Sequence, residues 1–348
     1  MNCCTRRHQT RRLLQVWGAA WTALTIGVAG ANAQSIEAFY TGKTILMIVP
    51  ADPGGSYDLH TRLLARHFAK WIPGRPHIIV QNMQGAGGLR AINYLYEKAP
   101  KDGTVLGMPV QENIIADVLG GADVRYKVPE FNWIGRLAPG SDVILTWHRY
   151  GVRTIDDAKI VSVPLGATGP ASGTSLYPLM LNSVLGTKFT IISGYRHNEM
   201  LLAIERGETG GAFSSLATLK STYPTWLAEK KISLLLAFAT ERVPELPDVN
   251  ILTDLGRTLD EKQVLAIFAS ASEIGRSLMT APHVPEDRIA ALRAAFDATL
   301  KDPEFLADLR KTHAEFGPMS GAALQRLVAD TRNVPPHVLE RARDAIRR

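Results

Sequence analysis

Apolar runs, glycine-rich turns and amphipathic stretches follow one another along most of the chain. Residues 44–49, 77–82 and 104–109 are short apolar runs, which is the pattern of buried strands. After the first of them, residues 58–71 carry apolar side chains at helical spacing, and Asp58 occupies the position expected of the helix N-cap. Strands that alternate with helices through short connections predict an α/β fold with a parallel sheet.

The middle of the chain repeats this alternation. A turn rich in Gly, Ser and Thr leads into a predicted helix in which Leu176, Leu179, Met180 and Val184 share one side. The strand-like runs of this region are 142–148, 160–166, 189–195, 210–215 and 232–239. The further predicted helices are a short one over 199–206, one over 289–300, one capped by Ser320 and one over 335–348.

Two glycine turns each lie directly between a predicted strand and a predicted helix. They are residues 53–58 and 85–88. A turn of this kind often exposes backbone N–H groups at the positive end of a helix dipole, which favours an anion. The carboxyl ends of neighbouring parallel strands meet at one edge of a sheet, so both turns are expected there. The turns therefore predict an anion or carboxylate site, and the alternative is glycine used for turn conformation alone.

The N-terminal segment differs from the rest. Residues 1–33 hold four arginines and no acidic residue, and a mostly apolar run ends in Ala31-Asn32-Ala33. This pattern predicts a signal peptide that is cleaved after Ala33, with export to the periplasm; an uncleaved membrane anchor is the alternative. Both cysteines lie in this segment, so the mature protein is expected to have no disulfide. Cleavage leaves 35 of the 39 basic residues against 33 acidic ones.

Several classes of function are disfavoured by charge and motifs. A nearly balanced mature charge gives no reason to expect nucleic-acid binding. Residues 85–90 have Arg90 where a dinucleotide fingerprint needs its last glycine, and residues 41–44 lack the first glycine of a phosphate-binding loop, which Glu37 replaces. The histidines are scattered and no Gly-x-Ser-x-Gly motif occurs. We expect no catalytic residue, no cofactor and no metal.

Four blocks of sequence, taken in order, resemble one known family. They are IVPADPGGSYD (48–58), IIVQNMQGAGGLRAINYLYEKAPKDGTVLG (78–107), LGATGPASGT (165–174) and LPDVNILTDLG (246–256). These blocks are similar to motifs of the periplasmic solute receptors of tripartite tricarboxylate transporters, the Bug or TctC-type binding proteins. The resemblance covers essentially the whole mature chain, and the first two blocks together are specific.

The resemblance implies a two-domain type II periplasmic-binding-protein fold with a cleft between the domains. Domain 1 would comprise 34–137 plus 240–348, and domain 2 would comprise 138–239. It also implies that backbone N–H groups of the glycine turns grip a ligand carboxylate. The ligand-binding positions carried over from the family are Pro53, Gly54, Gly55, Ser56, Tyr57, Asp58, Gly85, Ala86, Gly87, Gly88, Ser172, Gly173, Thr174 and Tyr195.

The chain departs from the family pattern in the second domain. Arg196 and His197 replace Lys-Gly after Tyr195, and Ser214 stands where many members have an aspartate. In the first domain, Gln84 replaces the usual proline before the second glycine turn. His148, Arg196 and His197 lie beside predicted strand ends or turns, so each is a candidate for facing the ligand. An extra cation at Arg196 and a lost acid at Ser214 would suit a ligand with a second anionic group.

The resemblance implies a receptor that closes on a small carboxylate and delivers it to the membrane subunits of a transporter. We expect a monomer. A receptor that signals through a partner protein would have the same binding site, so the sequence leaves that alternative open. An exported α/β hydrolase is a further alternative, for which no nucleophile–base pair is visible in the sequence.

Overall fold

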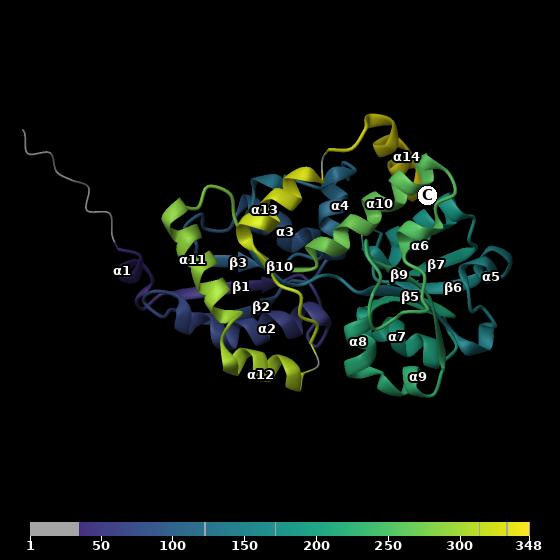
Figure 1. The fold of residues 1–348 in the computed structure, drawn as a ribbon, viewed down its shortest axis with the longest axis horizontal. Helices are drawn as coiled ribbons and strands as arrows, with labels where there is room; N and C mark the ends of the chain where they lie inside the picture. Colours follow the sequence, from purple (N-terminus) through teal and green to yellow (C-terminus); the bar gives the residue numbers. More distant parts are fainter. Residues whose placement is uncertain (1–34, 122, 171, 313, 332, 348) are drawn as a thin grey trace, which may run out of the picture. The chain divides into compact units, whose positions relative to one another are not determined.

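The computed structural model describes residues 35–347 apart from 122, 171, 313 and 332. The signal peptide predicted over residues 1–33, with its cleavage site and both cysteines, lies outside the described residues. Among the helices of the described part, none is both long and apolar enough to cross a membrane. The strands of the described part form two sheets, each with helices packed against it (Figure 1).

The first sheet has six strands in the order β11-β4-β10-β3-β1-β2. Their bounds are β1 Thr44–Val49, β2 His77–Asn82, β3 Val105–Gly107, β4 Asn132–Ala138, β10 Arg276–Thr280 and β11 Met319–Ser320. The strand β1 runs parallel to β2 and β3, whereas β10 is antiparallel to both β3 and β4. Two parallel βα units therefore form one end of this sheet, and their loops open at the same edge.

The second sheet has five strands in the order β7-β6-β8-β5-β9. Their bounds are β5 Asp142–Trp147, β6 Val163–Ala167, β7 Phe189–Ser193, β8 Gly211–Ser215 and β9 Ile232–Phe238. The strand β6 is parallel to β7 and β8, and β5 is antiparallel to β8 and β9. This sheet thus repeats the arrangement of the first.

The prediction of a parallel sheet is wrong in part, because both sheets are mixed. Only three residues, 139–141, separate β4 from β5, and these two strands belong to different sheets. The strands β10 and β11, which the chain adds to the first sheet after its return from the second, both run antiparallel to β4. Local alternation of strands and helices carries no information about such crossings, since it describes only neighbouring elements.

The helices fill the connections between strands and the C-terminal part of the chain. Their bounds are α1 Ile36–Tyr40, α2 Ser56–Phe68, α3 Leu89–Glu97, α4 Glu112–Val118, α5 Ile155–Ile160, α6 Gly173–Leu185, α7 His197–Glu205, α8 Leu216–Thr222, α9 Pro224–Ala228, α10 Leu259–Ile274, α11 Glu286–Thr299, α12 Pro303–Lys311, α13 Gly321–Asp330 and α14 Pro336–Ile346. Short 3-10 turns occur at Ala69–Trp71, Ala86–Gly88, Val128–Glu130, His148–Tyr150 and Leu252–Leu255.

The sequence predicted most of these elements. Strands 44–49 and 77–82 are confirmed with their bounds, and the hydroxyl of Ser320 caps α13 as expected. The N-cap assignment of Asp58 is wrong. The cap of α2 is Gly55, and Asp58 is the third helical residue, where its carboxylate accepts a hydrogen bond from the Gly54 N–H at 2.9 Å. The elements that were not predicted are the strands β4, β10 and β11 and the helices α1, α4, α5, α8, α9, α10 and α12.

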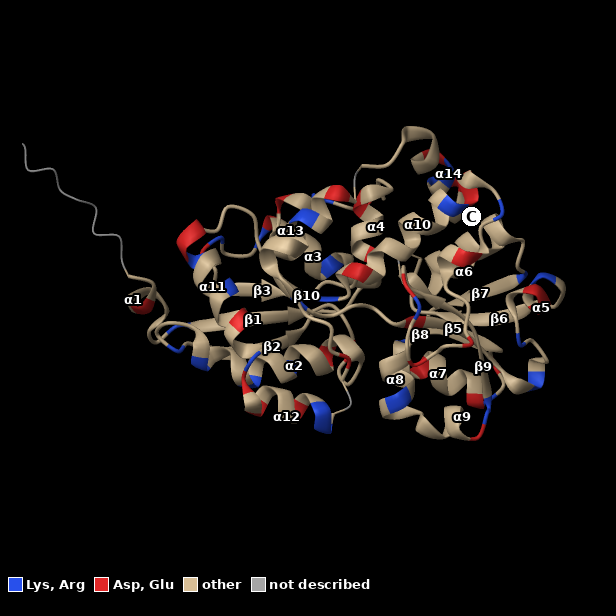
Figure 2. Ribbon diagram, in the orientation of Figure 1, with Lys and Arg blue, Asp and Glu red and all other residues tan. Residues whose placement is uncertain are grey.

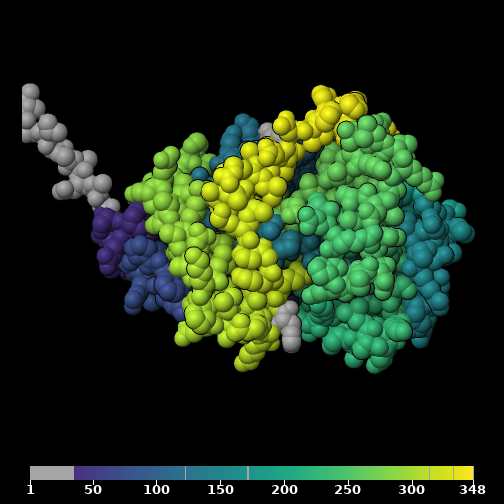
Figure 3. Space-filling model, in the orientation of Figure 1, coloured from purple at the N-terminus to yellow at the C-terminus, as the bar shows by residue number. Residues whose placement is uncertain are grey.

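Four hydrophobic clusters hold the described part of the chain together, two around each sheet, and the C-terminal helices contact clusters of both sheets. The helix α13 packs on β4 of the first sheet, whereas α14 packs on α6 beside the second sheet. Figure 3 shows the C-terminal segment, in yellow, on the surface of the molecule. The helix α10 also joins the core of the second sheet through Phe268. The domain boundaries expected from the resemblance stay a prediction, and α10 and α14 lie on the first-domain side of those boundaries. Figure 2 shows basic and acidic residues interspersed along α11, α12 and α13.

The turn between α10 and β10 generates a prediction about stability. Gly275 has φ 48° and ψ −128°, and a Cβ at this position would lie 2.2 Å from the backbone oxygen of Ala138. We expect Gly275→Ala to lower the free energy of unfolding by about 1–3 kcal/mol or more. The backbone conformation disfavours a side chain, and the added Cβ would clash with the oxygen of Ala138. Denaturant unfolding measures this. Gly169→Ala is the control, because a Cβ there has open space. Equal midpoints for the two variants would contradict this account of the turn.

Candidate ligand-binding cleft

A cavity of about 310 Å³ is lined by residues from both sheets. Residues 50–52, 55–57 and 84–88, from the loops after β1 and β2, form what we call the first wall. Residues 172–174, 195–198 and 213–215, which lie at or just before the starts of α6, α7 and α8, contribute to the opposite side, which we call the second wall. The two walls come from different sheets, so a molecule bound here would touch both halves of the fold.

Thirteen of the sixteen residues predicted to bind ligand line this cavity. They are Gly55, Ser56, Tyr57, Gly85, Ala86, Gly87, Gly88, Ser172, Gly173, Thr174, Tyr195, Arg196 and Ser214. The other three, Pro53, Gly54 and Asp58, are not among the lining residues. The candidate His148 is not a lining residue either, and its Nδ1 lies 2.9 Å from the carbonyl oxygen of Lys231. Contact of the thirteen with a ligand stays a prediction.

Asp58 does not line the cavity, but its hydrogen bonds support the first glycine turn. Its carboxylate accepts hydrogen bonds from Arg62 Nε and Asn82 Nδ2 at 2.9 Å, in addition to the one from the Gly54 N–H. Burial raises the pKa of Asp58, but the hydrogen bonds from Arg62, Gly54 and Asn82 outweigh it, so the net pKa is lower than usual. The Asp58 side chain therefore holds the loop in place. The loop in turn directs the N-terminus of α2 towards the cavity.

The second glycine turn needs glycine for its backbone conformation. Four successive residues have positive φ, namely Gly85 at 131°, Ala86 at 49°, Gly87 at 63° and Gly88 at 92°. Side chains oppose such angles, and a Cβ on Gly88 would also lie 2.7 Å from Asn113 Oδ1. The turn ends at the N-terminus of α3, for which Gly88 is the N-cap. Two helix N-termini, those of α2 and α3, thus belong to the first wall.

The hydroxyl groups of the second wall are partly used inside their own loop. Ser172 Oγ donates to the carbonyl oxygen of Gly169 at 2.7 Å and lies 2.5 Å from Thr174 Oγ1. Thr174 Oγ1 also accepts the N–H of Thr168 at 2.9 Å. In contrast, Ser214 Oγ is buried and has no hydrogen-bond partner among the described residues. Ser214 is therefore a hydroxyl of the second wall whose hydrogen-bonding capacity is unused.

Arg276 is the main residue of the cavity that the sequence analysis missed. It lines the cavity, yet it has no solvent exposure. Its Nε donates to Ser56 Oγ at 2.9 Å, its guanidinium carbon lies 4.3 Å from the centre of the Tyr57 ring, and its Nη2 lies 3.5 Å from Asp142 Oδ1. The only signal in the sequence was an arginine at the start of an apolar run, in a strand that was not predicted.

Three carboxyl groups, those of Asp142, Glu315 and Glu112, act on the charge of Arg276. Asp142 Oδ2 accepts a hydrogen bond from Gln111 Nε2 at 2.5 Å, and Glu112, which follows Gln111 in the chain, lines the cavity. Burial, with the negative charge of Asp142 as the next cause, raises the pKa of Glu112 to about 8, so a proton on Glu112 is favoured at neutral pH. Burial also raises the pKa of Glu315, to about 7.

Arg196 already has an anionic partner in the cavity. Its Nη2 lies 3.4 Å from Asp52 Oδ1, and Asp52 Oδ2 accepts the backbone N–H of His197 at 3.3 Å. Burial lowers the pKa of the His197 imidazole. Asp52 belongs to the loop after β1, and Arg196 precedes α7, so this contact joins the first wall to the second. The positive charge of Arg196 is thus balanced within the protein.

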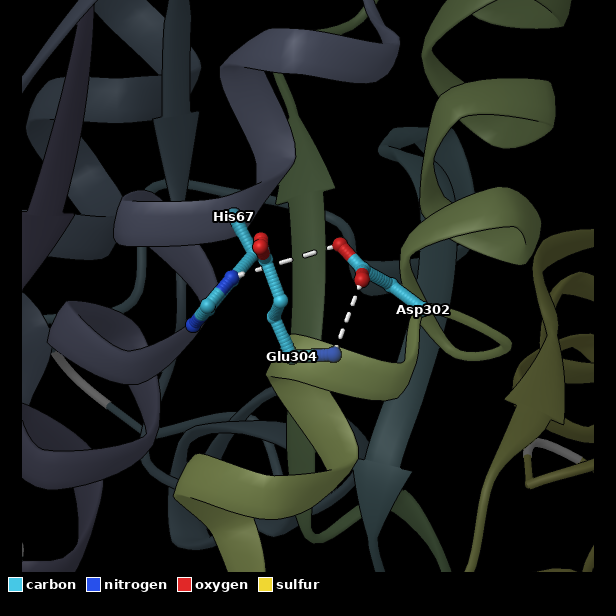
Figure 4. A group of neighbouring side chains, drawn as sticks. All are labelled: His67, Asp302 and Glu304. Atoms are coloured by element: carbon cyan, nitrogen blue, oxygen red, sulfur yellow. Dashed lines mark hydrogen bonds and ion pairs between the residues drawn. The ribbon is translucent and has the colours of Figure 1, made fainter.

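A second group of polar side chains lies away from the cavity. His67, Asp302 and Glu304 come close together between α2 and the start of α12 (Figure 4). The ammonium group of Lys70 pairs with both Asp302 and Glu304, at 2.7 Å from Glu304 Oε2. His67 Nε2 is 3.0 Å from Asp308 Oδ2. Lysine already supplies the positive charge that these carboxylates need, so the group is best described as an ion-pair network between helices.

Comparison with known proteins gives relatives along the whole chain. No family model matches the chain. A Cupriavidus necator protein, "UPF0065 protein in gbd 5'region", is 24% identical over 345 residues, which cover 96% of this chain and 98% of the relative. BugT of Bordetella pertussis is 38% identical over 119 residues, which is 34% of each chain.

Solved structures share the fold. The periplasmic binding protein BugD has a TM-score of 0.68 at 19% identity, with 88% of this chain and 98% of that one covered. MatC of Rhodopseudomonas palustris with bound malate gives 0.65 at 20% identity, with 88% and 99% covered. An R. palustris protein with adipate gives 0.66 at 19% identity, with 86% and 97% covered.

These likenesses confirm the fold class predicted from the sequence. The chain has the two-domain α/β fold of periplasmic solute-binding proteins. Its relatives in sequence and its neighbours in structure support the assignment to the Bug/TctC type of tripartite tricarboxylate receptor, as the four sequence blocks indicated.

The raised pKa of Glu112 generates a prediction about pH. Because the folded protein holds a proton on Glu112 more tightly than the unfolded chain does, the free energy of unfolding falls as the pH rises from the ordinary carboxyl pKa towards about 8. Glu112→Gln removes this titration. We expect the stability difference between the variant and the wild type to grow in favour of the variant by at most about 1.4 kcal/mol per pH unit over this window. Denaturant unfolding at pH 5 to 9 measures it, and a constant difference would contradict the assignment.

Proposed function

We propose that the chain is an exported solute receptor that binds a small carboxylate in this cavity and delivers it to a membrane transporter of the tripartite tricarboxylate type. The observation that carries the proposal is the pair of glycine turns in the first wall, each of which opens a helix N-terminus onto the cavity. The first N–H groups of a helix lack partners within the helix, and the helix dipole favours an anion there.

The comparisons support a carboxylate as the ligand. MatC was solved with malate and another neighbour with adipate, both of which are carboxylates. The described cavity also fits such a ligand, since its volume of about 310 Å³ suits a small molecule. The buried guanidinium of Arg276 adds positive charge below the N-terminus of α2, where the carboxylate would lie.

Closure of the two halves around the ligand would be the working motion. A ligand that touches both walls stabilises the closed form by the contacts it makes only there. The contact between Asp52 and the N-terminus of α7 would then form on closure, because it joins the two walls. The closed form would be the one that the transporter subunits bind, and a signalling partner could read the same form.

A binding role suits the cavity better than hydrolysis does. The Ser–His pair nearest to a catalytic arrangement is Ser56 and His60, with Oγ and Nδ1 3.5 Å apart. Both ring nitrogens of His60 already face backbone carbonyl oxygens, Nδ1 that of Ser56 at 2.8 Å and Nε2 that of Glu315 at 3.1 Å, so the imidazole is held by the backbone rather than directed at the serine hydroxyl. Burial, followed by the charge of Arg276, lowers the pKa of His60 to about 4. We therefore propose a receptor without catalytic residues, which acts in the periplasm after the signal peptide has been cleaved.

The role of the α2 N-terminus can be tested with a matched pair of variants at Ser56. Ser56 is the first residue of α2 and follows Gly55, whose φ of −77° and ψ of 171° are compatible with a following proline. Ser56→Pro removes the backbone N–H and the hydroxyl, whereas Ser56→Ala removes the hydroxyl alone. Since a hydrogen bond to a charged group contributes about 1.5–3 kcal/mol, we expect Ser56→Pro to bind carboxylates at least about tenfold more weakly than Ser56→Ala.

The measurement is calorimetric titration of residues 34–348, refolded to remove any carried ligand, with mono-, di- and tricarboxylates. A ligand at 100 times its Kd should also add about 2.7 kcal/mol to the stability of the wild type, which a melting curve detects. Equal affinity of the two variants would place the carboxylate elsewhere. Failure of the wild type to bind any carboxylate would overturn the proposed function.

A further inference from the structure

Two carboxyl groups of the protein lie at helix N-termini of the second wall. Asp52 reaches the N-terminus of α7 from the loop after β1, and Glu112 reaches the N-terminus of α6 from the start of α4. Neither residue was among the predicted site residues, and both line the cavity. Because an anion is what a helix N-terminus binds, these positions decide which charges the cavity can still accept.

Both carboxylate oxygens of Asp52 make contacts with the second wall. Oδ2 accepts the N–H of His197, the first residue of α7, at 3.3 Å, and Oδ1 lies 3.4 Å from Nη2 of Arg196. The side chain of Asp52 is only 17% exposed. The positive end of α7 and the one cation before it are therefore both matched by a carboxylate that belongs to the protein.

The contact of Glu112 is a close packing against α6. A Cβ placed on Gly173, the first residue of that helix, would lie 2.6 Å from Glu112 Oε1 and 2.9 Å from Cδ. Glycine is thus required at this position because the carboxyl group occupies the space above it. Glu112 is itself buried, so its carboxyl group occupies the space beside Gly173 whether or not it is ionised.

In the first wall, no described carboxyl group of the protein fills the helix N-termini that face the cavity. The first turn of α3 contains no acidic residue, and the acid of the first turn of α2, Asp58, is held behind the loop by Arg62 and Asn82. The cavity therefore offers an anion-binding end at α2 and α3 and a filled end at α6 and α7. Between them, the second wall presents the ring of Phe213 and the unpartnered hydroxyl of Ser214.

We propose that Asp52 and Glu112 determine specificity by filling the anion-binding positions of the second wall, so that the cavity accepts a monocarboxylate with a neutral polar distal end and rejects a dicarboxylate. This inference rests on the proposed function and names its ligand class. A second ligand carboxylate would be buried beside Asp52, where Arg196 already faces a carboxylate of the protein, while Arg276 lies below the N-terminus of α2, where the first carboxylate binds. A neutral hydroxyl or amide would instead meet Ser214.

The inference replaces the expectation from the sequence that Arg196 favours a second anionic group. Arg196 was expected to be an uncompensated cation, because its partner lies 144 positions earlier in the chain. With Asp52 beside it, its charge no longer calls for a ligand anion. The contrast with the neighbours that hold malate and adipate makes the inference testable with simple compounds.

The experiment compares ligands of equal length. Residues 34–348 are refolded and titrated calorimetrically with straight-chain acids of three to eight carbons, each as the monocarboxylate, the ω-hydroxy acid and the dicarboxylate. At the length that binds best, we expect the wild type to favour the ω-hydroxy acid over the dicarboxylate by about tenfold or more, since burying an unpaired charge is costly. A wild type that prefers the dicarboxylate would overturn the inference and leave the proposed function intact. A wild type that binds none of these acids would overturn the proposed function.

Variants identify the residues responsible. Asp52→Asn keeps the size of the side chain and removes its charge, whereas Glu112→Ala removes the carboxyl group that occupies the space beside Gly173. The two residues lie on different elements. We expect each to shift the ratio of dicarboxylate to ω-hydroxy-acid affinity towards the dicarboxylate by about fivefold or more. The ratio of the two affinities is measured because a variant that only destabilises the closed form would lower both affinities together and leave their ratio unchanged. Glu340→Gln, on the exposed side of α14, is the control and should leave the ratio unchanged. Unchanged ratios in both cavity variants would overturn the assignment of specificity to these two carboxyl groups.

Discussion

The buried guanidinium of Arg276 is the interaction on which the cavity depends. An unpaired charge without solvent exposure would be strongly unfavourable, so its surroundings must supply partners. Those partners come from both halves of the fold, with Ser56 and Tyr57 on α2 and Asp142 at the start of β5. Satisfying one cation therefore places the N-terminus of α2 and the first residue of the second sheet's β5 at the same point.

The other charges of the cavity are arranged around that cation in pairs. Asp52 faces Arg196 and the N-terminus of α7, and Asp142 faces Arg276, while the raised pKa of Glu112 keeps a proton on its carboxyl group at neutral pH. The interior is therefore close to electrically balanced before any ligand enters. In such a cavity the backbone N–H groups of the first wall, with the guanidinium of Arg276 below them, are the groups left to attract a carboxylate.

The two walls of the cavity differ in how closely they follow the pattern of the Bug and TctC-type receptors. The first wall keeps the glycine turns that relate the chain to Bug and TctC-type receptors, and its geometry follows from backbone conformations that glycine permits. The second wall carries three of the four departures from the family pattern, at Arg196, His197 and Ser214, and it also receives Asp52 and Glu112, whereas the first wall carries the departure at Gln84. Shared recognition of a carboxylate on one side can therefore coexist with a ligand preference that is particular to this chain.

The sequence by itself determined the local units of this protein. The strands β1 and β2, the glycine turns and the helices after them follow from apolar spacing and glycine conformations, which depend on neighbours in the chain. The tertiary structure decided the direction of β10, the role of Asp58 as a support of the loop rather than a cap, and the partners of Arg196. It also decided the contacts of Arg276 with Ser56, 220 positions away, and of Glu112 with Gly173. Such pairs are set by how the sheets cross and pack, and no local pattern of residues encodes that arrangement.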